Sequence, residues 1–331
     1  MSRESKILGA VFLILGIVLL LLQFNNNSKV DPDRTFHVED KGRIFEVFIT
    51  HRDGEQVKLS KKGDAWILND VFVANPNIME NLLDAIARIQ IKYVPPQAAV
   101  PGIINDLAKN GIRVEIFGRN HEKLIGYYVG GSTVDERGTH IIRENSDLPF
   151  VGELAGWEGN LRFRFRMKGD EWRDKTIFQY KVRDLEKVAL TYPKQQLASF
   201  TLTQEKGTFN ISSNSSLRKS LVISNAKGIA YLSGFEKLGA EAFETNNPYR
   251  DSIEQSLPFV TITLKEKKGK QRHLKVWPIY PLQSSETGVV TKNESGIVER
   301  YFAGDEKGEF YLIQDRVFRK IFRGFDYFTQ N

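Results

Sequence analysis

The sequence has 331 residues, with 47 Lys and Arg against 41 Asp and Glu, and its length suggests about two ordinary domains. The formal charge of +6 is scattered along the chain, whereas nucleic-acid-binding proteins concentrate basic residues on one stripe, so we expect no nucleic-acid partner. Because the sequence contains no cysteine, it excludes a disulfide scaffold, a thiolate zinc site, an iron–sulfur cluster, a cysteine nucleophile and a lipidated cysteine anchor.

The first predicted element is a membrane-spanning helix at residues 7–24. Residues 7–22 contain no polar side chain, and the whole segment is about 27 Å long as a helix, close to the ~30 Å hydrocarbon core of a bilayer. The apolar run is longer than that of an ordinary signal peptide, and Asn25–Lys29 offers no small-residue cleavage pattern. We therefore predict an uncleaved anchor, with a cleaved signal peptide and a buried core helix as the alternatives.

The flanks of this helix predict its orientation. Arg3 and Lys6 precede the span, so the positive-inside rule places residues 1–6 in the cytoplasm. Residues 25–41 are polar and charged and are predicted to form a linker. The long region that follows contains no second span, and long domains are translocated largely regardless of charge. We expect a single-pass protein of the inner, cytoplasmic membrane whose C-terminal region lies in the periplasm.

An α+β domain is predicted at residues 42–160. It opens with an antiparallel meander, in which Gly54 and Gly63 mark the turns between strands. A helix is expected from Asn75 to Pro95, because apolar residues recur at helical spacing between these points. In chain order the predicted strands are 44–49, 56–59, 65–68, 112–117, 124–129 and 139–143, with a short helix at 105–110 and a short final element at 150–157.

A second α+β domain, residues 161–331, is predicted to repeat this order of elements. Strands 186–191, 199–203 and 208–211 match the opening meander, helix 224–235 matches the first helix, strands 259–264 and 274–279 match 112–117 and 124–129, strand 309–314 matches 139–143, and helix 317–328 matches the final element. Residues 278–298 are predicted to form a long loop. The predicted fold is thus α+β, with an N-terminal transmembrane helix followed by two similar β-rich domains that arose by internal duplication.

The predicted domain junction carries a candidate interaction site. Between residues 161 and 167, apolar side chains alternate with Arg162, Arg164 and Arg166, and this period of two predicts a strand with the arginines on one face. Together with Trp172 and Arg173, that face is a candidate for binding phosphate or an acidic partner. The alternative is a half-exposed strand whose arginines pair with neighbouring Asp and Glu.

The predicted C-terminal helix is the second candidate interaction site. Phe318, Phe322 and Phe325 lie on overlapping faces of this helix, and basic residues occupy the other side. An amphipathic helix of this kind docks into a partner or lies on a membrane surface. The alternative is a terminal helix that caps the core of the second domain.

The sequence shows no motif of known catalytic or metal-binding chemistry. The five histidines form no H-E-x-x-H motif and no i,i+4 pair, and the closest local pair, His51 with Asp53, lies in a predicted turn. There is no G-x-S-x-G nucleophile elbow and no G-x-x-x-x-G-K-[ST] phosphate loop. We therefore expect no enzymatic activity, no cofactor and no metal site.

The order of these features resembles domain-of-unknown-function family 4340 in its Bacteroidetes-type form. The residues that carry the resemblance are Arg34–Val38, the hairpin at 57–66, Gly130–Gly131, Gly138–Thr139, Pro149–Val151, Trp172–Lys175, Phe178, Asp184–Leu185 and Ser199–Phe200. The resemblance covers most of residues 34–210. It implies membrane-anchored, envelope-facing, β-rich domains of unknown activity, and members that lie beside gliding-type ABC transporter components suggest a transport accessory role. It supplies no catalytic residues.

These features predict a membrane-anchored scaffold or interaction subunit of a cell-envelope complex, attached to the inner membrane through residues 7–24. Its expected partner is an envelope protein, with components of an ABC-type transport or gliding-related system as the candidates. The first alternative is a periplasmic glycan- or lipid-binding module that uses a groove between the two domains. The second alternative is an envelope hydrolase.

Overall fold

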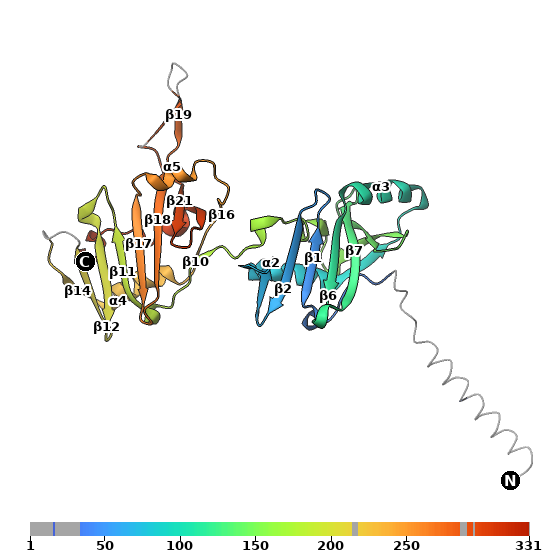
Figure 1. Cartoon of the computed structure of the whole chain (residues 1–331), viewed down its shortest axis with the longest axis horizontal. Helices are drawn as coiled ribbons and strands as arrows, with labels where there is room; N and C mark the ends of the chain where they lie inside the picture. Colours follow the sequence, from blue (N-terminus) through green and yellow to red (C-terminus); the bar gives the residue numbers. More distant parts are fainter. Residues whose placement is uncertain (1–15, 17–33, 214–217, 285–289, 294, 331) are drawn as a thin grey trace, which may run out of the picture. The chain divides into compact units, whose positions relative to one another are not determined.

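The computed structural model describes residues 16, 34–213, 218–284, 290–293 and 295–330 (Figure 1). The chain divides into two compact units, Met1–Arg173 (unit 1) and Asp174–Asn331 (unit 2). Apart from Gly16, the predicted membrane span at residues 7–24 lies outside the described residues, as do the predicted cytoplasmic residues 1–6. None of the described helices combines the length and the apolar character that crossing a membrane requires.

Within its described residues, unit 1 is built on one antiparallel sheet of nine strands. Across the sheet the strands are β4 (Phe72–Val73), β3 (Ala65–Leu68), β2 (Gln56–Lys62), β1 (Glu46–Thr50), β6 (Ile112–Phe117), β7 (Lys123–Ser132), β8 (Thr139–Arg143), β9 (Pro149–Leu154) and β5 (Ile89–Tyr93). In the centre, Val47 of β1 lies opposite Leu59 of β2 and Ile116 of β6. All three side chains are buried, as the period-two alternation of these strands requires.

The sheet of unit 2 repeats this strand order position by position. Its strands are β14 (Leu221–Ile223), β13 (Thr208–Ser213), β12 (Phe200–Glu205), β11 (Leu185–Thr191), β17 (Val260–Glu266), β18 (Gln271–Ile279), β21 (Arg300–Asp305), β22 (Phe310–Gln314) and β16 (Ala242–Phe243). The expected match of 309–314 with 139–143 is wrong, because β21 occupies the place of β8 and β22 occupies the place of β9. A small sheet joins β10 (Thr176–Phe178) to β15 (Leu238–Gly239).

Helices complete each unit. In unit 1 they are α2 (Pro76–Arg88), α3 (Val100–Asn110), η2 (Lys41–Arg43), η3 (Gln97–Ala99), η4 (Arg119–His121), η5 (Leu161–Arg164) and η6 (Gly169–Trp172). In unit 2 they are α4 (Asn225–Leu232), α5 (Arg250–Gln255), α6 (Asp315–Phe318), α7 (Asp326–Thr329), η7 (Val182–Asp184), η8 (Gln196–Ala198) and η9 (Ser233–Phe235). In Figure 1, α2 lies behind the strands of the first sheet, and α3 lies at one end of β7.

Two predicted segments take a different secondary structure. The helix expected to run to Pro95 ends at Arg88, because the β-branched and aromatic residues of β5 pair with β9 instead. The loop expected at residues 278–298 contains a hairpin of β19 (Leu282–Ser284) and β20 (Val290–Lys292). Both differences arise from strand pairing, which a local pattern does not reveal.

Glycine positions the turns of the two meanders. Gly63 has a φ of +60° between β2 and β3, and Gly207 has a φ of +84° between β12 and β13. Only glycine adopts such angles without a steric cost. The two turns hold equivalent places in the strand order, so both units reverse the chain at the same point.

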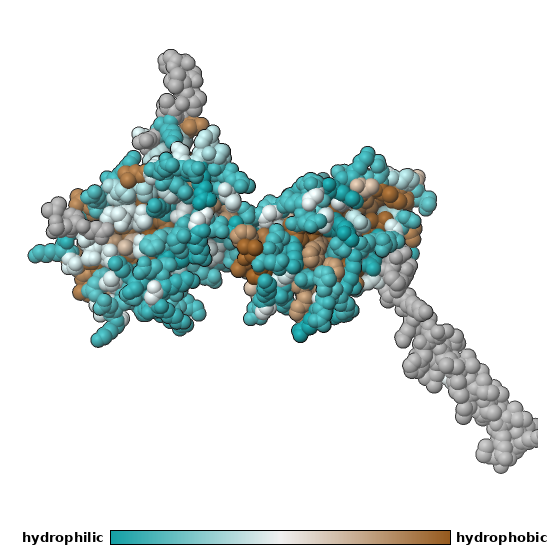
Figure 2. Space-filling view, viewed as in Figure 1, coloured by the Kyte–Doolittle hydropathy of each residue, from teal (hydrophilic) through white to brown (hydrophobic). Residues whose placement is uncertain are grey.

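Each unit has its own hydrophobic core, and the visible face of both units in Figure 2 is largely hydrophilic. The core of unit 1 includes Phe36 and Val38, so these residues of the predicted linker at 25–41 belong to the folded domain. The same core includes Leu161, Phe165 and Trp172. The boundary between the units therefore follows Arg173 rather than residue 160.

Candidate functional site

The arginine-rich segment at residues 161–167 forms the 3-10 helix η5 and the chain that follows it, so the predicted strand is wrong. Asn160 caps the helix, since its Oδ1 accepts a hydrogen bond of 2.8 Å from the backbone N–H of Arg162. Leu161 and Phe165 are both buried. Because a helical turn and an alternating strand would each bury this pair, their burial does not distinguish the two structures. Arg162 and Arg164 lie in the helix and Arg166 lies in the chain after it. The first two reach different partners, since Arg162 bonds Val129 and Asn110 whereas Arg164 bonds Asn81.

Arg162 is a structural residue. Its guanidinium donates hydrogen bonds to the carbonyl oxygens of Val129 at 3.0 Å and Asn110 at 2.5 Å, which fastens η5 to the end of β7 and to the end of α3. Burial lowers the pKa of Arg162, and the charge of Arg166 lowers it further. Arg162 is therefore already used within the unit.

Arg164 lies between two aromatic rings and α2. Its guanidinium carbon is 5.3 Å from the ring centroid of Trp157 and 5.4 Å from that of Phe163. Its Nη1 donates a hydrogen bond of 2.9 Å to the carbonyl oxygen of Asn81. The buried Nε has no hydrogen-bond partner among the residues that the structure describes. These contacts orient the guanidinium along α2 while leaving one donor unused.

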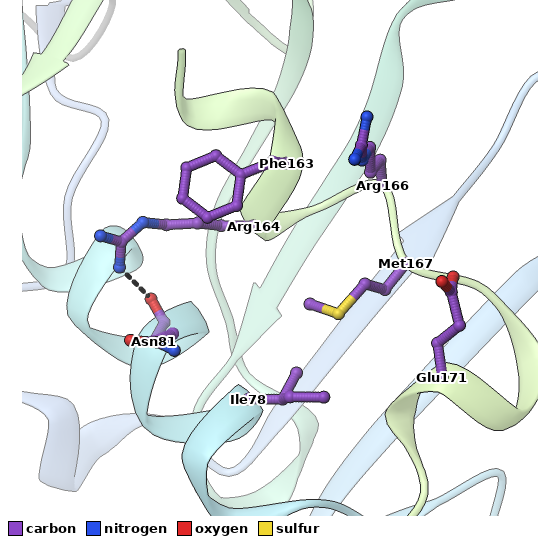
Figure 3. Close-up of a pocket in the computed structure, with 7 residues that line it drawn as sticks. All are labelled: Ile78, Asn81, Phe163, Arg164, Arg166, Met167 and Glu171. Atoms are coloured by element: carbon purple, nitrogen blue, oxygen red, sulfur yellow. Dashed lines mark hydrogen bonds between the residues drawn. The ribbon is translucent and has the colours of Figure 1, made fainter. Parts of the chain in front are cut away.

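A pocket of about 450 Å³ opens beside Arg164 and is lined by residues of α2, η5, η6 and the chain between η5 and η6. Figure 3 shows its lining residues, which are Ile78, Asn81, Phe163, Arg164, Arg166, Met167 and Glu171. The pocket is open to solvent, and Phe163 exposes 44% of its surface. Ile78 and Met167 pack against the hydrophobic core, so the pocket has an apolar floor beneath charged walls.

Arg166 is the exposed cation of this pocket. It forms no ion pair with any residue that the structure describes. Among the described residues that line the pocket, Glu171 is the one with a carboxylate, and its Oε2 already accepts a 2.9 Å hydrogen bond from the backbone N–H of Lys168. The pocket thus presents an unpaired guanidinium to solvent.

Residues 165–173, which include Arg166, form a segment that we call the closing segment. The turn at residues 51–55 holds the closing segment in place. The carbonyl oxygen of Met167 accepts hydrogen bonds from Trp172 Nε1 at 2.8 Å and from His51 Nε2 at 3.3 Å. Glu55 accepts a 2.7 Å hydrogen bond from the N–H of Gly169. These bonds fix the backbone on one side of the pocket.

His51 and Asp53 have structural roles in this turn. Burial lowers the pKa of His51, and the hydrogen bond to Met167 requires a proton on Nε2. Asp53 pairs with Lys168, which lowers the pKa of the Asp53 carboxyl. Among the described residues, no group of three His, Cys, Asp or Glu side chains is arranged to hold a metal ion.

Trp172 and Arg173, two of the predicted interaction residues, lie inside unit 1. Trp172 is fully buried, and Arg173 exposes only 5% of its surface. The guanidinium of Arg173 stacks 3.7 Å from the ring centroid of Phe72, and its Nη1 donates to Asp170 at 3.0 Å. Both side chains stabilise the end of the unit and are not available at its surface to a partner.

The predicted C-terminal helix is two short helices, α6 and α7, with an irregular turn between them. A Cβ on Gly324 would lie 3.2 Å from Cβ of Ala198, and the N–H of Phe325 donates to the carbonyl oxygen of Ala198 at 2.9 Å. Phe318 and Phe325 are buried in the core of unit 2, and Phe322 packs partly buried against it. The three aromatic side chains therefore belong to the core, which is the alternative that the sequence left open.

The pocket also uses residues that the sequence pattern did not single out. Ile78 reads as one more apolar position of an amphipathic helix, although its side chain is only half buried. Asn81 lies one turn further along the same face of α2. In the sequence, Met167 lies on the apolar side of the strand predicted for residues 161–167. Their proximity depends on how η5 folds back on α2, and no local signal reports that contact.

The described residues form an α+β fold with one large antiparallel sheet in each unit, and the candidate site is an open pocket of unit 1 with an apolar floor and an unpaired guanidinium. The chain belongs to the family described as domain of unknown function (DUF4340), whose model matches residues 74–252. The matched range contains every residue that lines the pocket. No curated protein and no solved structure matches the chain.

Proposed function

We propose that this protein is an interaction subunit of a cell-envelope complex and that the pocket of unit 1 is where it binds its partner. One observation carries the proposal: the exposed, unpaired guanidinium of Arg166 lies in the same open pocket as the half-exposed ring of Phe163. Arginine and aromatic residues are the types that most often dominate binding energy in protein interfaces.

The proposal places the pocket at a membrane. The apolar run at residues 7–24 supports a single anchor in the inner membrane, with residues 25–331 in the periplasm. A tethered protein meets membrane-bound partners at a high effective concentration, so a modest pocket suffices for binding. We propose a component of an ABC-type transport or gliding-related system as the partner.

Internal duplication is part of the same proposal. The two sheets have the same strand order, and equivalent glycines turn their meanders. A duplicated chain retains the scaffold of both units while only one of them needs to carry the binding residues. In unit 2 the place of η5 is taken by α6, whose Phe318 is buried in the core.

Chemical crosslinking followed by affinity purification from membranes tests this function. We expect the full-length protein to recover an envelope partner, and we expect Arg166→Gln to recover less of it. Arg183→Gln is the matched control, because Arg183 is an exposed arginine of unit 2 whose ion pair is with the adjacent Asp184. Equal recovery with Arg166→Gln would contradict the role of the pocket. A C-terminal region shielded from protease in spheroplasts would contradict the periplasmic placement.

A further inference from the structure

We propose that the unit 1 pocket recognises an acidic peptide segment in which an apolar side chain lies next to carboxylates. This inference rests on the proposed function and names the chemistry of the partner. It draws on three properties of the pocket, which are its apolar floor, its exposed and unpaired Arg166, and its fixed walls.

The apolar floor selects an apolar side chain. Ile78 and Met167 are half buried against the core, and Phe163 exposes 44% of its surface beside them. Covering this surface removes apolar area from water, which favours binding. Small-molecule sites usually enclose most of their ligand, whereas this pocket is open to solvent. An open pocket with an apolar floor suits one side chain of a larger partner.

Arg166 selects a carboxylate. Its side chain is exposed and has no ion-pair partner in the described part of the chain. A guanidinium presents a planar fork that matches a carboxylate with two parallel hydrogen bonds.

The walls of the pocket are fixed before any partner arrives. The Met167 carbonyl accepts two hydrogen bonds, and Gly169 is bonded to Glu55, so the closing segment has little freedom to lose. The Arg164 guanidinium is held between two rings and α2. Preorganisation of this kind reduces the entropic cost of association.

The surrounding charge favours a peptide over an anionic membrane surface or a phosphate. Asp84 Oδ2 lies 3.9 Å from Arg164 Nη1. Glu171 lines the pocket on the side away from Arg164 (Figure 3). A membrane surface requires a broad basic patch, and a polyphosphate requires several converging cations. The pocket offers one exposed guanidinium next to an apolar floor, which corresponds to a single acidic side chain beside an apolar one.

Fluorescence anisotropy with the detergent-solubilised full-length protein tests the inference. The probe is a fluorescein-labelled peptide, Gly-Ser-Gly-Asp-Asp-Phe-Asp-Asp-Gly-Ser-Gly, and the matched control peptide has Asn in place of each Asp. We expect the acidic peptide to bind at low salt and the Asn peptide to bind at least about tenfold more weakly. Added salt should weaken the acidic peptide selectively, because the contact is exposed.

Variants locate the binding at the pocket. We expect Arg166→Gln to weaken the acidic peptide about tenfold and Phe163→Ala about fivefold, with Arg183→Gln unchanged. Both pocket residues are exposed enough for the fold to persist, which circular dichroism checks. Equal binding of the two peptides, or an undiminished affinity in Arg166→Gln, would overturn the inference.

Two further probes separate the inference from the proposed function. Binding of phosphatidylglycerol vesicles or of inorganic phosphate, without binding of the acidic peptide, would overturn the peptide assignment. If the peptide fails to bind while membrane crosslinking still depends on Arg166, the proposed function stands and the partner chemistry is wrong. If neither depends on Arg166, both the inference and the proposed binding site are wrong.

Discussion

His51 and Tyr192 hold the same place in the two units and make the same kind of contact. Each residue directly follows the strand at the same position of its sheet, His51 after β1 and Tyr192 after β11. His51 Nε2 donates to the carbonyl oxygen of Met167 at 3.3 Å, and Tyr192 Oη donates to that of Arg323 at 2.8 Å. In both units a buried donor thus fastens the segment that follows the last strands of the sheet.

Removing the Tyr192 hydroxyl, which donates to the Arg323 carbonyl, should destabilise unit 2. Tyr192→Phe keeps the ring, which packs 5.5 Å from Phe259, and removes only the hydroxyl. The Arg323 carbonyl then loses its partner, so we expect the free energy of unfolding to fall by about 1–2 kcal/mol. Urea denaturation of the full-length protein measures this change. Tyr249→Phe is the control, because Tyr249 is 71% exposed, and an equal loss in both variants would contradict the role of the contact.

His51 should make the stability of unit 1 depend on pH. Burial lowers the native pKa of His51 below the ordinary value of 6.5, and Lys168 lowers it further, whereas the Met167 hydrogen bond, Glu55 and Asp53 raise it. The unfolded chain therefore binds the proton first as pH falls. Stability is complete above about pH 6.5 and is lost as pH falls from that value toward the lower native pKa. His140 acts in the same direction, because burial also lowers its pKa.

Thermal melts at pH 7.5, 6.5 and 5.5 check this dependence. We expect the melting temperature to fall with pH, and we expect His51→Gln to reduce the slope, since the glutamine amide keeps a donor but does not titrate. The carboxyls with a shifted pKa, such as Asp53 and Glu144, also have lowered values, but they titrate below about pH 4.5 and do not contribute here. A slope unchanged in both His51→Gln and His140→Gln would refute the assignment.

The meanders could be predicted from the sequence because their signals are local. Residues 112–117 alternate apolar and polar side chains, and β6 has these bounds in the structure. Gly54 and Gly63 mark turns where φ is positive. By contrast, β4 and β16 are two residues long, which is too short for a periodic pattern to appear. Residues 89–93 fit a helix face as well as a strand, and only their pairing with β9 decides between the two.

The candidate site was predictable only in part. The sequence identified the arginine segment, and two of its arginines, Arg164 and Arg166, line the pocket. It did not reveal that Asn160 would cap a helix there, because a cap and a turn residue look alike in sequence. Trp172 lies in a polar stretch that reads as exposed, yet tertiary contacts bury it completely. Contacts between η5 and α2, which create the pocket, are invisible to any local pattern.

The cap at Asn160 should control both stability and binding. Its Oδ1 accepts hydrogen bonds from the N–H of Arg162 at 2.8 Å and from the hydroxyl of Thr139 at 3.1 Å. We expect Asn160→Ala to lower the free energy of unfolding by about 1 kcal/mol and to weaken the acidic peptide, because η5 positions Arg164. Chemical denaturation and anisotropy measure the two effects. Asn77→Ala is the control, since its exposed side chain lies on α2 outside the pocket lining, and a similar loss there would contradict the cap.

Two helical glycines should respond in opposite directions to the same substitution. A Cβ on Gly228 of α4 would lie 2.4 Å from the ring of Phe209, whereas a Cβ on Gly102 of α3 would meet nothing within 4 Å. Both positions have ordinary helical backbone, so alanine gains about 0.5–1 kcal/mol of helix stability at each. At Gly228 the clash with a buried ring costs about 1–3 kcal/mol and outweighs that gain.

We therefore expect Gly102→Ala to raise the melting temperature and Gly228→Ala to lower it, measured by calorimetry on the full-length protein. The double variant Gly228→Ala with Phe209→Leu should recover part of the loss, because the smaller side chain makes room for the new methyl group. A melting temperature raised by Gly228→Ala alone would show that α4 does not pack directly on Phe209. The packing of α4 against β13, on which the core of unit 2 depends, would then need a different arrangement.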